Sequence, residues 1–164
     1  MPKILLLRPP ENNDSSFVQM YTLNDSLGIG YLAAYLRVHG VPVDILDAEI
    51  LGLGIEETIE EIRRRDFDLL GISIISPLVL PQALRIAEGI KAARKDLHIT
   101  MGGEHPTSYC DSILMRCYAL DTIVRFEGEE TLLDLAGKVH APGEWEKIPG
   151  IAFRKNGEIK TTPP

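Results

Sequence analysis

The chain has 164 residues, 45% of them hydrophobic and 25% charged, with a formal net charge of −7 at pH 7. This length is typical of a single domain with a substantial core, while the acidic balance excludes a nucleic-acid surface and no apolar run approaches the about 18 residues of a membrane span. The two cysteines, Cys110 and Cys117, are too few for a disulfide framework and match no usual zinc or iron–sulfur spacing, so we expect reduced thiols in a cytoplasmic protein.

Short apolar runs alternate with amphipathic segments along the chain. The predicted strands are Lys3–Arg8, Val43–Leu46, Leu69–Ile75, His98–Met101 and Asp121–Val124. The predicted helices are Leu27–His39, Glu56–Arg65, Leu80–Lys95, Thr107–Met115 and Glu129–Val139. Most of the apolar runs lack polar alternation, which is typical of strands covered on both faces. The pattern therefore predicts a three-layer α/β domain with a doubly wound parallel sheet of five strands.

Two segments depart from this alternation. Pro9–Asp25 is a long polar connection between the first strand and the first helix, and connections of that length inside a compact domain are usually functional or mobile. Ile151–Thr162 contains Asn156-Gly157 between two strand-like runs, which predicts a C-terminal β-hairpin at an edge of the domain. We expect an α/β domain over residues 1–145, followed by the hairpin and the start of a linker over residues 146–164.

A glycine pattern at the start of the first helix matches a dinucleotide-binding fingerprint. It is Gly28-x-Gly30-x-x-Ala33, with Asp47 near the distance expected for the acidic ribose ligand. That fingerprint needs its first glycine directly after the first strand, whereas nineteen residues separate Arg8 from Gly28. A domain that binds a dinucleotide or a sugar nucleotide stays an alternative, beside the structural interpretation that both glycines let the helix pack closely on the sheet.

Small and polar residues follow two of the predicted strands. Ser73 and Ser76 lie at the end of the third strand, and Gly102-Gly103 follow the fourth. Open α/β sheets bind ligands at this edge, where a serine hydroxyl can hydrogen-bond a buried ligand and paired glycines let the backbone approach it. The sequence thus predicts a ligand-binding cleft at the carboxyl end of the sheet.

These pieces, taken in order, resemble a known signature. Asp25-x-Leu27-x-x-Gly30, Ser73-x-Ile75 and Gly102-Gly103 are similar to the Asp-x-His-x-x-Gly … Ser-x-Leu … Gly-Gly pattern of cobalamin-binding domains. The intervals resemble that family's too, with 42 residues between Gly30 and Ser73 and 26 between Ile75 and Gly102. Further segments look like the N-terminal domain of cobalamin-dependent radical SAM enzymes, namely Leu27–Arg37, Asp68–Ser73, Gly102–Thr107, Glu127–Leu132 and Ile148–Gly157. The resemblance covers essentially the whole chain.

The resemblance implies a flavodoxin-like or Rossmann-like domain that binds cobalamin. The cofactor-binding residues that it implies are Asp25, Leu27, Gly28, Gly30, Ser73, Ser76, Gly102, Gly103, Glu104, His105, Phe126, Glu127 and Gly128. Because Leu27 stands where the signature has an axial histidine, the implied mode is base-off with no protein histidine on cobalt. His105 is interpreted as a structural or hydrogen-bonding residue rather than a cobalt ligand.

The resemblance also implies a partner, the downstream radical SAM barrel of the same polypeptide, which would carry S-adenosylmethionine and a [4Fe–4S] cluster. This chain lacks the Cys-x-x-x-Cys-x-x-Cys motif that binds the cluster in that family, so we expect the chain itself not to be catalytic. Its role would be to hold the corrinoid beside the radical site of a methyltransferase- or cyclase-type enzyme.

Phe126 departs from the family pattern, which often has a glycine at this position. A phenylalanine there predicts a tighter loop or a partly filled pocket. It also keeps open a further alternative, in which the domain has kept the fold, lost the ligand and serves as an interaction module. The neighbouring Glu127, Glu129 and Glu130 match the positive end of a helix dipole.

Overall fold

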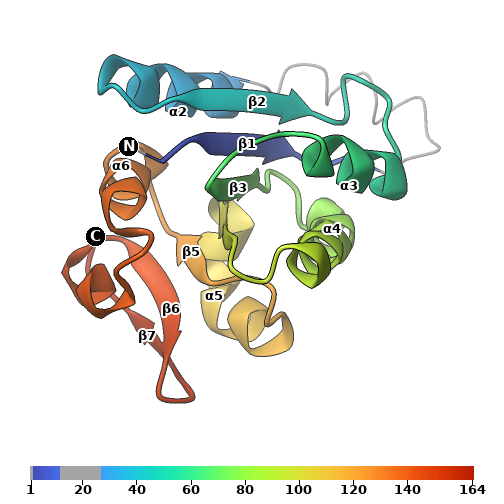
Figure 1. Cartoon of the computed structure of the whole chain (residues 1–164). Helices are drawn as coiled ribbons and strands as arrows, with labels where there is room; N and C mark the ends of the chain where they lie inside the picture. The colour runs from blue at the N-terminus through green and yellow to red at the C-terminus, as the bar shows by residue number, and fades with distance from the viewer. Residues whose placement is uncertain (1, 12–26) are drawn as a thin grey trace.

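The structure is a computed structural model that describes residues 2–11 and 27–164 (Figure 1). The strands are β1 (Ile4–Arg8), β2 (Val43–Asp47), β3 (Leu69–Ser73), β4 (His98–Gly102), β5 (Thr122–Val124), β6 (Ile151–Lys155) and β7 (Glu158–Thr161). They form one seven-stranded sheet in the order β2-β1-β3-β4-β5-β6-β7. The predicted set of five parallel strands is confirmed, and the hairpin adds β6, antiparallel to β5, and β7, antiparallel to β6. Most of the predicted Pro9–Asp25 connection lies outside the described residues.

Helices cover both faces of the sheet. They are α2 (Leu27–Val38), α3 (Ile55–Arg63), α4 (Leu80–Ala93), α5 (Glu104–Arg116) and α6 (Gly128–Lys138), with 3-10 turns η1 (Pro77–Val79) and η2 (Pro142–Lys147). One core joins α2 and α6 to side chains such as Leu6 and Phe153, and the other joins α3, α4 and α5 to side chains such as Leu5 and Ile72. Adjacent residues of β1 therefore face different cores, which explains why the strand is apolar throughout. In the described part of the chain, no helix is long and apolar enough to cross a membrane.

Helix α5 starts three residues earlier than the sequence pattern indicates, at Glu104 instead of Thr107. Gly103 is its N-cap and takes a positive φ of 122°, which turns the chain directly from β4 into the helix. The helix is kinked at Tyr109, whose φ and ψ of −122° and 25° are not helical. Cys110 and Cys117 are buried and free, and burial raises the pKa of both thiols.

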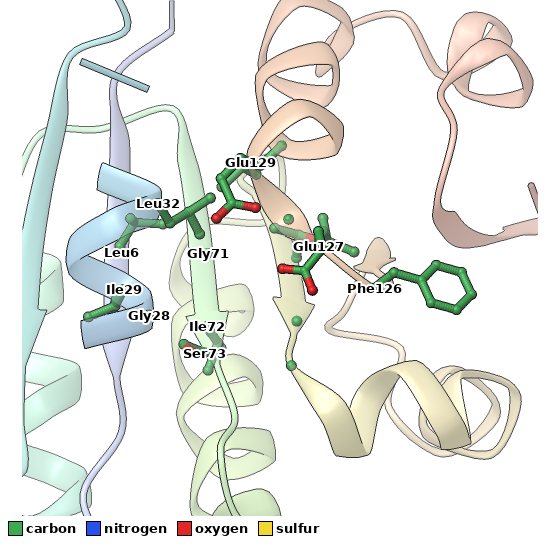
Figure 2. A pocket seen from close by; sticks show the side chains of 16 residues that line it. Leu6, Gly28, Ile29, Leu32, Gly71, Ile72, Ser73, Phe126, Glu127 and Glu129 are labelled. Atoms are coloured by element: carbon green, nitrogen blue, oxygen red, sulfur yellow. The ribbon is translucent and has the colours of Figure 1, made fainter. Parts of the chain in front are cut away.

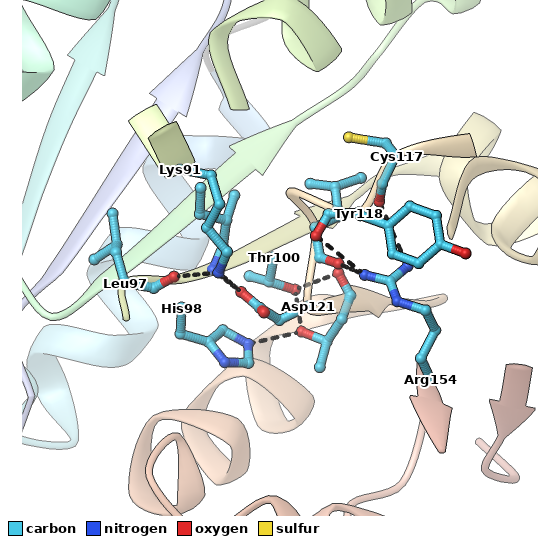
Figure 3. A network of polar contacts seen from close by, with 11 residues as sticks. Lys91, Leu97, His98, Thr100, Cys117, Tyr118, Asp121 and Arg154 are labelled. Atoms are coloured by element: carbon cyan, nitrogen blue, oxygen red, sulfur yellow. Dashed lines mark hydrogen bonds and ion pairs between the residues drawn. The ribbon is translucent and has the colours of Figure 1, made fainter. Parts of the chain in front are cut away.

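The C-terminal hairpin is fixed to the rest of the domain. Its turn has positive φ values at Asn156 and Gly157, as the sequence predicted for a two-residue hairpin loop. The Arg154 guanidinium donates to the carbonyl oxygens of Leu114, at 2.6 Å, and of Leu120 (Figure 3). These bonds connect β6 to the end of α5, so the hairpin is an integral edge of the sheet.

His98 begins β4 and is buried, with 6% of its surface exposed. Its Nε2 lies 3.0 Å from Thr122 Oγ1 (Figure 3), and its ring meets the edge of Trp145 at 5.1 Å between centroids. Burial lowers the pKa of His98 from 6.5 to about 4, with the Asp121 carboxylate acting weakly in the opposite direction. The imidazole is therefore neutral at pH 7.

We expect His98 to make the protein less stable in mild acid. The His98 imidazole is protonated near pH 6.5 in the unfolded chain but only near pH 4 in the folded chain. Its contribution to the free energy of unfolding is therefore fully present above pH 6.5 and is lost as the pH falls toward 4. The loss attributable to this group is about 3 kcal/mol over that range. In urea unfolding between pH 6.5 and 4.5, wild type should lose stability more steeply than His98→Gln, whose amide can still donate to Thr122. Equal slopes would contradict the assignment.

Candidate functional site

A cleft of about 200 Å³ opens between α2 and α6 over the carboxyl half of the central strands (Figure 2). It is lined by Leu6, Gly28, Ile29, Leu32, Gly71, Ile72, Ser73, Thr100, Gly102, Gly103, Val124, Phe126, Glu127, Gly128, Glu129 and Leu132. Its surface is mainly apolar, and Figure 2 shows the carboxylates of Glu127 and Glu129 directed into it from the α6 side. The cleft lies at the sheet edge that the sequence predicted for a ligand.

Glycines on the central strands let neighbouring groups pack directly against the floor of the cleft. A Cβ on Gly71 would lie 2.9 Å from Leu6 Cδ2, and one on Gly102 would lie 3.3 Å from the Val124 carbonyl oxygen. At Gly28 and Gly30, by contrast, a Cβ would meet no described atom within 4 Å. The interpretation that these two helix glycines are needed for close packing on the sheet is therefore wrong. The space beside Gly28 belongs to the cleft.

The structure brings part of the predicted site together. Gly28, Ser73, Gly102, Gly103, Phe126, Glu127 and Gly128 line the cleft, whereas Leu27, Gly30, Ser76, Glu104 and His105 do not. Ser76 instead caps η1 by accepting from the Leu78 N–H at 3.3 Å, and the His105 ring stacks on Tyr109 at 4.7 Å between centroids. Asp25 lies outside the described residues. A cofactor role for these residues stays a prediction.

Comparison with protein families shows to which family the chain belongs. A family model described as a B12-binding domain matches residues 19–136, which is most of the chain. The chain belongs to the B12-binding domain family. The cleft therefore lies in the B12-binding domain at the edge where glycines and small polar side chains leave room for a ligand. The open space at Gly28 fits a bulky group placed between α2 and α6.

This B12-binding domain is similar to parts of longer proteins. Over 99% of its length it is 29% identical to an uncharacterized methyltransferase of Pyrococcus horikoshii and 31% identical to an anaerobic magnesium-protoporphyrin IX monomethyl ester cyclase of Synechocystis sp.. It spans about a third of these relatives, 35% and 32% of their lengths. The cobalamin-dependent S-adenosylmethionine radical enzyme OxsB, solved with aqua-cobalamin and S-adenosylmethionine, shares its fold with a TM-score of 0.81 at 24% identity, over 99% of this chain and 22% of that chain.

Many of the residues that line the cleft were not predicted from the sequence. The missed residues are Leu6, Ile29, Leu32, Gly71, Ile72, Thr100, Val124, Glu129 and Leu132. Most of them lie inside strands or helices, where only the register decides which face a side chain takes. Gly71 carried a usable signal, because a glycine within an apolar central strand often marks a close approach of another group.

Phe126 contributes to the mouth of the cleft without filling it. Figure 2 shows its ring directed away from the cavity, and the residue is 49% exposed. Its backbone has a φ of 61°, and its N–H donates to Thr107 Oγ1 at 3.0 Å. The Arg125 guanidinium lies 4.7 Å from the ring centroid. The prediction that this side chain fills part of the pocket is therefore wrong. The positive φ and the hydrogen bond to Thr107 instead fit the other prediction, a tighter loop.

We expect a Phe126→Gly variant to be about 1 kcal/mol more stable to unfolding than a Phe126→Ala variant. Both substitutions remove the ring and its contact with Arg125, but only glycine avoids the steric cost of a Cβ at a φ of 61°. Chemical denaturation of the two variants side by side measures the difference. Equal midpoints, or a more stable alanine variant, would show that this turn is not strained.

Proposed function

We propose that this domain holds cobalamin base-off, with no protein histidine on cobalt, as the N-terminal part of a radical SAM enzyme of methyltransferase or cyclase type. The placement of the histidines carries the proposed mode. The chain has four, all of them described, and none is among the residues that line the cleft. Leu27, which takes the place of the signature histidine, begins α2 and is 67% exposed.

Each of the four histidines lies in an environment outside the cleft. His98 is buried at the amino end of β4, and His140 follows the end of α6, so both lie away from the carboxyl end of the sheet. His39 follows α2, with its Nδ1 2.9 Å from the Tyr35 carbonyl oxygen. His105 lies in the first turn of α5 with its ring against Tyr109. This arrangement supports a cobalt without an imidazole ligand from the protein.

The cleft suits the nucleotide tail of a base-off corrinoid. Its walls are apolar side chains from α2 and α6, its floor contains Gly71 and Gly102, and Ser73 brings a hydroxyl to the end of β3. An aromatic base could enter over the glycines and bury its faces against leucine and isoleucine side chains, while the serine hydroxyl hydrogen-bonds a ring nitrogen. The residues expected to hold the tail are therefore Gly28, Ser73, Gly102 and Gly103.

The carboxyl edge of the sheet, here called the rim, carries exposed apolar side chains. Leu27, Ile75, Leu78 and Phe126 are all exposed apolar side chains, and each follows the carboxyl end of a strand or begins the next helix. Contiguous patches of exposed apolar side chains usually mark a binding surface. When bound, the corrin would supply a cobalt atom able to carry a one-carbon group. The rim would support one face of the macrocycle and leave the other face open.

The downstream part of the enzyme completes the proposal. Residues 1–145 would form the cobalamin-binding unit, and residues 146–164 would form the hairpin and the start of the connection to a radical SAM barrel. S-adenosylmethionine and the [4Fe–4S] cluster would belong to that barrel. The proposal is supported by relatives that are about three times as long as the part matched here and carry methyltransferase and cyclase names.

Loading with hydroxocobalamin tests the function and the mode together. After desalting, the chain should retain the corrinoid and show the absorption spectrum of a base-off form. After reduction to cob(II)alamin, electron paramagnetic resonance should show no nitrogen splitting, because no histidine lines the cleft and the lower base is displaced.

Three results would contradict the proposal in different ways. Nitrogen splitting that disappears in His105→Ala would make that histidine the ligand, and splitting that persists would mean that the lower base stays on cobalt. Retention of NAD with no retention of corrinoid would favour the dinucleotide interpretation of Gly28-x-Gly30-x-x-Ala33.

A further inference from the structure

The residues that follow β7, here called the C-terminal segment (Thr162–Pro164), are bound to the start of the turn between β5 and α6. The Thr162 carbonyl oxygen accepts a hydrogen bond from Arg125 Nη1 at 3.2 Å. The Pro163 carbonyl oxygen accepts from the Gly150 N–H at 2.7 Å, and the Gly150 carbonyl oxygen accepts from the Arg125 N–H at 2.7 Å. Arg125 thus holds the C-terminal segment directly through its side chain and, by way of Gly150, through its backbone.

The same residue begins the turn that forms one side of the cleft. Arg125 directly follows β5, and the next three residues, Phe126, Glu127 and Gly128, all line the cleft. On the other side of the turn, the Phe126 N–H donates to Thr107 Oγ1 of α5 at 3.0 Å. The turn is therefore held from two directions, by α5 and by the C-terminal segment.

The Arg125 guanidinium also contacts the aromatic ring at the mouth of the cleft. Its central carbon lies 4.7 Å from the centroid of the Phe126 ring, which is directed away from the cavity (Figure 2). Arg125 Nε is buried and makes no hydrogen bond to any residue that the structure describes. The guanidinium is therefore held between the Thr162 carbonyl oxygen and the ring. Without it, the hydrophobic effect would draw this half-exposed ring toward the apolar lining of the cleft.

We infer that Arg125 is a positioning residue that couples the C-terminal segment to the occupancy of the cleft. The inference rests on the proposed function, because the occupant is cobalamin. By binding Thr162 and the Phe126 ring, Arg125 keeps the turn in the shape that leaves the cleft open. Such a coupling is reciprocal, so bound cobalamin must hold the C-terminal segment more firmly by the same factor by which the segment raises cobalamin affinity.

Arg154 provides a matched control, because it makes the same kinds of contact away from the cleft. Its guanidinium also joins the hairpin to the rest of the domain, donating to the carbonyl oxygens of Leu114, at 2.6 Å, and of Leu120 (Figure 3). It also lies over an aromatic ring, 5.0 Å from the centroid of Tyr118. These partners lie at the end of α5 and before β5, at the amino end of the sheet, and none of them lines the cleft.

Equilibrium dialysis of the whole chain against hydroxocobalamin tests one direction of the coupling. Arg125→Met, which keeps the aliphatic stem and removes the guanidinium, should weaken cobalamin binding about fivefold or more. Arg154→Met should lose stability and keep the affinity of the wild type. Wild-type affinity in Arg125→Met, or an equal loss in both variants, would overturn the inference and leave the proposed function intact. A wild-type chain that retains no cobalamin would refute the proposed function and the inference with it.

Hydrogen exchange of the wild-type chain tests the reverse direction and needs no variant. The N–H groups of Gly150 and Thr162 take part in the hydrogen bonds that fasten the C-terminal segment, so their exchange reports its release. Hydroxocobalamin should slow their exchange about fivefold or more beyond the slowing at Phe153. Phe153 lies in the middle of β6, between β5 and β7, and reports the general stabilisation that any bound ligand gives. Equal slowing at all three amides would overturn the inference, because a merely structural role for Arg125 predicts no additional protection of the segment.

Discussion

Replacing Gly103 by alanine should lower the free energy of unfolding by about 3 kcal/mol or more. Gly103 has a φ of 122° and ψ of −179°, a conformation that side chains rarely adopt. A Cβ at this position would lie 2.0 Å from the Ile74 carbonyl oxygen. Because Ile74 N also donates to the Gly102 carbonyl at 2.9 Å, the backbone after β3 is fixed against the end of β4 and has no room to move. Urea or thermal unfolding measures the loss.

The adjacent glycine is the matched control. Gly102 has no positive φ, and its Cβ would lie 3.3 Å from the Val124 carbonyl oxygen, so a shift of a few tenths of an ångström accommodates it. Gly102→Ala should therefore cost about 1 kcal/mol or less. If the two variants unfolded at the same denaturant concentration, the close approach at Gly103 would not be a determinant of the fold.

Much of the fold could be predicted because the local signals agree with the topology. The runs at residues 4–8 and 69–73 are apolar without alternation, and the structure covers both with helices on each face. Asn156-Gly157 specified a hairpin turn, and both residues have the positive φ that such a turn needs. The start of α5 was missed because Gly103, rather than a capping side chain, sets it.

The site could be predicted at strand ends and not inside the elements. Ser73 and Gly102 line the cleft as expected, because a parallel sheet brings its carboxyl ends to one edge. Leu32 and Thr100 were missed, since their facing depends on helix rotation and strand register. No sequence pattern shows that Thr100 turns its hydroxyl toward Thr122 or that the Phe126 ring points away from the cleft.

Replacing Gly28 by leucine should abolish cobalamin retention while leaving the domain folded. Gly28 lies in the first turn of α2, lines the cleft, and has no described atom within 4 Å of the position of a Cβ. A leucine there would occupy the space into which the ligand must enter. The same substitution should raise helix stability by up to about 1 kcal/mol, because glycine is a poor helix former. Affinity for hydroxocobalamin and the denaturation midpoint should therefore change in opposite directions.

Gly137→Leu provides the control for this prediction. Gly137 is an exposed helical glycine in α6 whose Cβ would also meet nothing within 4 Å, and it does not line the cleft. Its replacement should give a similar gain in stability with no change in cobalamin affinity. Retention of cobalamin by Gly28→Leu, or an equal loss of affinity in both variants, would show that the ligand does not pass between α2 and α6. The opposite movement of stability and affinity at Gly28 alone is what a glycine kept for ligand space predicts, because a glycine kept for folding would lose both together.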